Sequence, residues 1–182
     1  MATVHVNLEH PEGGYAARVV RAKAAEFMDK LGMQGAEVSI LITTDLRIRK
    51  LNRQFRGKNK ATDVLSFPAG DDTPSIPGQP LYVGDVAISL DTARRRAAED
   101  GRSLAFELSR YLAHGILHLL GYDHERSERE ARAMAKREAE LLGVPGMLED
   151  AKGVGDRVRP PGTSRKGRSG VEGQAKARRR SR

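Results

Sequence analysis

The chain has 182 residues, no cysteine, four Phe, four Tyr and no Trp, and its formal net charge is +8. This length fits one domain with a tail, and the lack of cysteine excludes disulfides and thiolate metal ligands. The excess charge lies in residues 151–182, which contain eleven Lys or Arg and two Asp or Glu. We therefore expect a folded domain at 1–150 and a basic, disordered tail at 151–182.

Hydrophobic periodicity divides the first part of the chain into alternating strands and helices. Apolar residues at every second position indicate strands, and apolar residues three and four apart indicate helices. We expect Thr44 or Asp45 to cap the second helix, because a side-chain oxygen there can accept from the first-turn N–H groups. The predicted elements are a strand over residues 4–8, a helix over 15–31, a strand over 37–43 and a helix over 45–54.

The second part of the chain contains two further strands and three helices. We expect Asp91 and Ser103 to cap two of these helices and Gly143 to end the last. In order, the predicted segments are a strand over 62–67, a loop over 69–80, a strand over 81–90 and helices over 91–100, 104–120 and 125–142. The order favours an α+β domain, with about four strands in one sheet packed by about five helices.

Three of the five histidines lie within eleven residues, at His114, His118 and His124. His114 and His118 are four apart, so on a helix they share one face. Gly121 can end that helix with a positive φ, and the chain can then bring His124 back to the same point. Three imidazoles with a fourth position open are typical of a catalytic zinc site. The neighbouring Leu and Ile residues place this site on a buried helix in the C-terminal half.

The same spacing offers a competing interpretation. The pattern H-x-x-x-H-x-x-G-x-x-H is that of the metzincin zinc peptidases, in which a Glu directly after the first His is the general base. In this chain that position is Gly115. A metallopeptidase is therefore the alternative that the metal spacing offers, but the motif lacks its base.

Two further features are candidates for chemistry. Four basic residues lie just ahead of the predicted strand at 62–67 and indicate a phosphate-contacting patch, because Arg donates hydrogen bonds to phosphate in pairs. Asp85 lies in an apolar strand. Three roles are open for it: to accept a structural hydrogen bond, to orient a ligand histidine, or to hold an attacking water. The basic residues of the patch are Arg53, Arg56, Lys58 and Lys60.

Three motifs occurring in order resemble the YbeY family of bacterial endoribonucleases, which act in rRNA maturation. The resemblance runs from about Val4 to Leu142 and leaves out the tail, and Ala61 stands where we expect the family to favour Pro. The motifs are Phe55-Arg56-Gly57-Lys58 with Thr62-Asp63-Val64-Leu65-Ser66-Phe67-Pro68, then Gly84-Asp85-Val86, and then the run from His114 to His124.

The resemblance implies a zinc-dependent, single-strand-specific endoribonuclease that acts in 3′-end maturation of small-subunit rRNA and in ribosome quality control. It implies one Zn²⁺ per chain, held by His114, His118 and His124, and an important role for Arg56. Zinc would activate a water or polarise a phosphoryl oxygen, and Arg56 would stabilise charge on the phosphate. Asp85 is the candidate base, and the RNA 2′-OH is an alternative nucleophile.

A non-catalytic ribosome-assembly protein with a structural zinc is the other alternative function. No apolar run approaches the length that spans a membrane, and the first residues lack a secretory signal. We therefore expect a cytoplasmic protein with no membrane partner. Its expected partners are rRNA in the small ribosomal subunit and ribosome-associated proteins.

Overall fold

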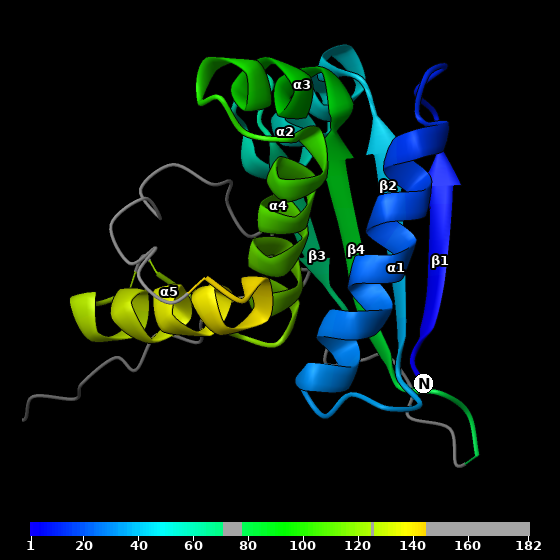
Figure 1. Cartoon of the computed structure of the whole chain (residues 1–182), viewed down its shortest axis with the longest axis vertical. Helices are drawn as coiled ribbons and strands as arrows, with labels where there is room; N and C mark the ends of the chain where they lie inside the picture. Colours follow the sequence, from blue (N-terminus) through cyan, green and yellow to red (C-terminus); the bar gives the residue numbers. More distant parts are fainter. Residues whose placement is uncertain (71–77, 125, 145–182) are drawn as a thin grey trace, which may run out of the picture.

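The computed structural model describes residues 1–70, 78–124 and 126–144, and the tail expected at 151–182 lies outside them. The described residues confirm the α+β class, with one four-stranded sheet and five helices (Figure 1). In chain order the elements are β1 (Thr3–Leu8), α1 (Gly14–Lys30), β2 (Glu37–Thr43), α2 (Asp45–Arg56), β3 (Val64–Pro68), β4 (Tyr82–Ser89), α3 (Leu90–Glu99), α4 (Leu104–Leu119) and α5 (Glu128–Leu142).

The sheet is mixed, with the strand order β1-β2-β4-β3. β1 and β2 are parallel, as are β2 and β4, so helices connect them across a face of the sheet. β3 runs antiparallel to β4, from Val64 opposite Ile88 to Pro68 opposite Gly84. β4 is therefore a central strand, and β3 is an edge strand.

The two faces of the sheet are covered by different helices. Figure 1 shows α1 and α4 in front of the sheet and α2 behind it. Side chains alternate between the faces along each strand. Val86 therefore joins the main core with α1 and α4, whereas the next residue, Ala87, joins Leu65 and Ile48 of α2 in a smaller cluster. From Gly84 onward, where the pairing with β2 is regular, a residue of β4 can thus be assigned to a face by its position relative to Val86.

Helix α4 lies close against the sheet. Ser103 caps the helix as predicted, and its hydroxyl accepts from the Phe106 N–H at 3.1 Å. Every residue from Tyr111 to Leu119 is buried. A Cβ atom added to Gly115 would lie 2.7 Å from Cγ1 of Val86, inside normal contact distance. Residue 115 therefore faces the sheet, and the helix can approach this closely because that residue has no side chain.

The prediction that Asp91 caps α3 is wrong. The helix begins earlier, and its cap is Ser89, whose hydroxyl accepts from the Thr92 N–H at 3.2 Å. Asp91 instead accepts from the Asp45 N–H at 2.8 Å and lies 3.1 Å from Nε2 of His10. Contacts with the first residue of α2 and with His10 thus engage the carboxylate that we expected to cap the helix.

The remaining boundaries differ from the predictions by a few residues. β3 begins at Val64, after Asp63 turns its carboxylate back to accept from the Val64 N–H at 2.9 Å. α5 begins after Ser127, whose hydroxyl accepts from the Glu130 N–H at 3.2 Å. It ends at Gly143 as predicted. These shifts leave the predicted order of elements unchanged.

Candidate metal centre

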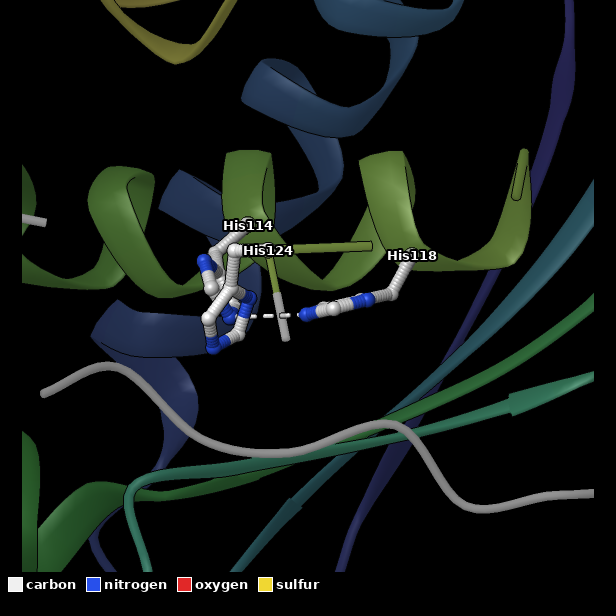
Figure 2. Close-up of side chains that lie close together, drawn as sticks. All are labelled: His114, His118 and His124. Atoms are coloured by element: carbon white, nitrogen blue, oxygen red, sulfur yellow. Dashed lines mark hydrogen bonds between the residues drawn. The ribbon is translucent and has the colours of Figure 1, made fainter. Parts of the chain in front are cut away.

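The three histidines of the motif converge on one point, as the sequence predicted (Figure 2). His114 and His118 lie on the same face of α4, one turn apart. The helix ends where Gly121 adopts a φ of 92° and its N–H bonds to the carbonyl of His118 at 3.1 Å. This turn brings His124 back beside the other two rings.

The distances between the rings fit a shared metal ion. Nε2 of His114 lies 3.0 Å from Nε2 of His118, and each histidine offers one nitrogen so that all three lie within 4.8 Å of one another. The ring centroids of His124 lie 5.2 Å from His114 and 5.1 Å from His118. Nitrogens at zinc's usual distance of about 2.0–2.1 Å would lie roughly 3–3.5 Å apart on a tetrahedral ion. The cluster could therefore hold a metal after small shifts.

Burial keeps the His118 ring neutral, which is the form of imidazole that binds metals. His114 and His118 are 2% and 1% exposed. Burial, reinforced by the neighbouring His114 and His124, lowers the pKa of His118 from 6.5 to about 3, although the Tyr122 main chain acts in the opposite direction. His118 is therefore neutral at physiological pH, and a neutral imidazole has a lone pair for a metal.

Glu138 belongs to this centre, although no sequence motif singled it out. Its Oε1 lies 2.6 Å from Nδ1 of His114, and its side chain is 10% exposed. It comes from α5, 24 residues further along the chain. The one available signal was its helical spacing with the core residues Met134 and Leu141, which places a carboxylate on the apolar side of the helix.

The structure does not bring Asp85 to the histidines. Asp85 precedes Val86, the residue that faces Gly115 of α4, so its side chain projects from the opposite face of the sheet. It is exposed there, beside Tyr82. Burial raises the pKa of Tyr82 to about 12, and the Asp85 carboxylate adds to that shift. Strand β4 therefore supplies no base close to the metal centre.

Arg56 lies at the C-terminal end of α2, on the helix that covers the face opposite α4. Its neighbour Phe55 packs edge to face on Phe67 of the edge strand β3, with ring centroids 5.1 Å apart. Arg56 is half-buried. Arg56 and the histidines thus lie on helices that cover opposite faces of the sheet.

The basic patch continues along α2 and the loop that follows it. Lys50, Arg53 and Lys60 are exposed, and none of them forms an ion pair with any residue that the structure describes. Phe55, between them in the chain, is 42% exposed. Exposed cations beside an exposed aromatic ring can bind phosphates and stack on a base.

The base position of the peptidase motif lies against the sheet. Residue 115 faces Val86, Ser66 and Val64 of the sheet, whereas the peptidase base must point at the metal-bound water. A glutamate here would be directed into the core. The peptidase alternative thus lacks the side chain of its base, and the close contacts of Gly115 leave little space for one.

Within the described part of the chain, each helix is too short or too polar to cross a membrane.

Comparisons of the sequence with known proteins agree on one family. The family model described as Endoribonuclease YbeY matches residues 12–144. The chain is 56% identical over 154 residues to Endoribonuclease YbeY of Anaeromyxobacter dehalogenans (strain 2CP-C), covering 85% of this chain and 77% of that protein. It is 52% identical over 157 residues to the protein of the same name from Anaeromyxobacter sp. (strain Fw109-5), covering 86% and 79%.

A solved structure also matches most of the fold. The solution structure of a Thermotoga maritima protein aligns with a TM-score of 0.55 and 25% sequence identity. The alignment covers 81% of this chain and 89% of the other.

Proposed function

Because the chain belongs to the YbeY endoribonuclease family, we propose that it is a zinc-dependent endoribonuclease specific for single strands. Its proposed role is 3′-end maturation of small-subunit rRNA and ribosome quality control. The observation that carries the proposal is the convergence of His114, His118 and His124 in a chain 56% identical to a protein named Endoribonuclease YbeY.

The donor set favours zinc as the metal. Three imidazole nitrogens, without thiolates, suit a borderline ion such as Zn²⁺, and three protein ligands leave a coordination position open for substrate or water. When bound, zinc would act as a Lewis acid on the phosphodiester and lower the pKa of a coordinated water.

The chain's own residues would bind and orient the RNA. The exposed cations Lys50, Arg53 and Lys60 would hold the phosphate backbone, and Phe55 would stack on an unpaired base. Arg56, at the end of α2, would then donate to the scissile phosphate and stabilise its developing charge. Preference for single strands follows from stacking, because a base paired in a duplex cannot present its face.

The proposal includes a cellular setting. Its partners would be rRNA in the small ribosomal subunit, together with ribosome-associated proteins, and its location would be the cytoplasm. The basic residues at 151–182 would add a sequence-independent attraction to RNA.

The central experiment measures RNA cleavage and zinc content together. We expect His114→Ala to lose both, because it removes a ligand, and Arg56→Ala to keep zinc but lose most of its cleavage. His5→Ala and Arg132→Ala are the matched controls, since His5 is half-exposed on β1 and Arg132 is 82% exposed on α5. Full activity in Arg56→Ala would refute the role of that residue.

The same assay separates the proposal from the non-catalytic alternative. Zinc-loaded wild-type protein that binds rRNA but never cuts it, even with ribosomes present, would refute the endoribonuclease and support an assembly protein. Peptide cleavage that disappears in His114→Ala would instead support the peptidase.

A further inference from the structure

A carboxylate is buried against the first histidine of the motif. Glu138 lies on α5 at helical spacing from Met134 and Leu141, both of which belong to the main core. A buried carboxylate is costly unless it is paired and hydrogen-bonded. Here the partner is Nδ1 of His114, at 2.6 Å from Oε1.

This hydrogen bond determines which nitrogen of His114 carries the proton. A carboxylate can only accept, so Nδ1 must donate to it, and a neutral imidazole has a single N–H. The lone pair of His114 is then on Nε2. That nitrogen faces Nε2 of His118 at 3.0 Å, which is the side on which the three rings converge.

The bond also fixes the orientation of the ring. A histidine on α4 can rotate about two side-chain torsions, and a metal ligand must hold both. The 2.6 Å contact ties the far side of the His114 ring to a second helix. Helix α5 packs on α4, and its Met134 and Leu141 belong to the main core, so the acceptor is itself held in place.

We propose that Glu138 is a positioning residue of the metal centre: it holds His114 in the Nδ1–H tautomer and directs Nε2 at the ion. The proposal rests on the metal centre of the proposed function. Carboxylates that orient ligand histidines typically change metal affinity by about 10–100-fold. Loss of a merely structural pair would lower stability without changing metal affinity.

The first test is nitrogen NMR of the metal-free wild-type protein. We expect the His114 ring to be the Nδ1–H tautomer. An Nε2–H tautomer in the wild type would overturn the proposal without any variant.

The second test compares zinc affinity, measured by competition with a chromophoric chelator, in three variants. Glu138→Met keeps the length and helix propensity of the side chain, but its thioether is only a weak acceptor. We therefore expect zinc affinity to fall about 10–100-fold and His114 to populate the other tautomer. Glu138→Gln can still accept through its oxygen and should restore most of the affinity. Glu140→Gln, on the exposed side of α5 and paired with Arg137, should match the wild type.

Replacing zinc with Co²⁺ adds a spectroscopic measurement. We expect the visible bands of Glu138→Met to shift relative to the wild type, because the His114 ring is no longer held. A folded Glu138→Met protein with wild-type affinity, tautomer and cobalt spectrum would overturn the proposal. If that variant does not fold, the wild-type tautomer decides the question.

None of these measurements requires RNA, so the two proposals fail separately. Loss of affinity in Glu138→Met together with no RNA cleavage by the wild type would refute only the proposed function. RNA cleavage by the wild type together with unchanged affinity in Glu138→Met would refute only the positioning role.

Discussion

The hydroxyl of Ser66 donates a hydrogen bond to the main-chain carbonyl of Gly115, at 3.1 Å. This bond joins the edge strand β3 to the helix that carries two of the three histidines. A Cβ atom at residue 115 would lie 3.2 Å from that hydroxyl and 2.7 Å from Cγ1 of Val86. The position of α4 on the sheet, and so the position of His114 and His118, depends on residue 115 having no side chain.

Gly115→Ala should therefore destabilise the fold. Alanine stabilises a helix by about 1 kcal/mol relative to glycine, but overpacking a dense core costs about 1–3 kcal/mol. We therefore expect the free energy of unfolding to fall by about 1 kcal/mol. Urea unfolding measures it. Gly14→Ala, at the start of α1 with nothing within 4 Å of its added Cβ, is the control and should be neutral or stabilising. Equal stabilisation by both changes would show that the helix does not need this close contact.

Acid should destabilise the metal-free protein through His118. Its pKa falls to about 3 in the folded state, against 6.5 ordinarily, chiefly because the ring is buried. At a pH between these two values, the unfolded chain binds a proton that the folded chain does not. The free energy of unfolding therefore falls as the pH falls through this range. The contribution of the neutral His118 to stability is fully present above pH 6.5.

Urea unfolding of the metal-free protein at about pH 7 and about pH 5 measures this loss, which we expect to be about 1–2 kcal/mol. His118→Gln should flatten the pH dependence. His5→Gln, at a half-exposed position on β1, keeps His118 and should retain the wild-type dependence. If the pH dependence persists unchanged in His118→Gln, groups other than His118 cause it.

Breaking a buried ion pair near the start of α4 should cost much more stability than breaking an exposed pair. Glu107 is fully buried and lies 2.6 Å from Arg110, whose side chain is 14% exposed. Glu107→Gln leaves a largely buried guanidinium without its carboxylate, so we expect a loss of about 3 kcal/mol. Glu99→Gln breaks the exposed pair with Arg96 on α3 and should cost less than about 0.5 kcal/mol. Similar losses in both variants would show that burial does not strengthen the first pair.

Removing residues 151–182 should weaken RNA binding and reduce its dependence on salt. The segment carries eleven Lys or Arg, and each phosphate neutralised on a single strand adds about 0.7 to the slope of log affinity against log salt. Binding titrations at several salt concentrations, with the full chain and the truncated chain, measure the slope. Zinc affinity serves as the control and should not change. An unchanged slope would show that this segment does not contribute to RNA binding.

The sequence predicted the local part of the metal centre because that part depends on spacing along one helix and one turn. His114 and His118 are four residues apart, and Gly121 takes the left-handed conformation that returns His124. The cap at Ser103 is equally local, since the hydroxyl and the N–H it bonds lie three residues apart. Residues within one turn of each other leave a readable pattern.

The remaining contacts depend on how distant segments pack, and the sequence carries no pattern for them. Asp91 has the side chain of a helix cap, but the packing of α2 beside it presents the N–H of Asp45 instead. Asp85 lies next to a residue that faces α4, and alternation alone does not say which face of the sheet α4 covers. Glu138 approaches His114 only after α5 packs on α4.

The contact between Glu138 and His114 also sets the size of the smallest fragment that can bind metal normally. All three histidines are present once the chain reaches His124, and the motif alone would mark the end of the unit there. The orienting carboxylate follows on α5, which ends at Leu142. A fragment that stops between these two points would keep every ligand and yet hold its first one in no fixed orientation.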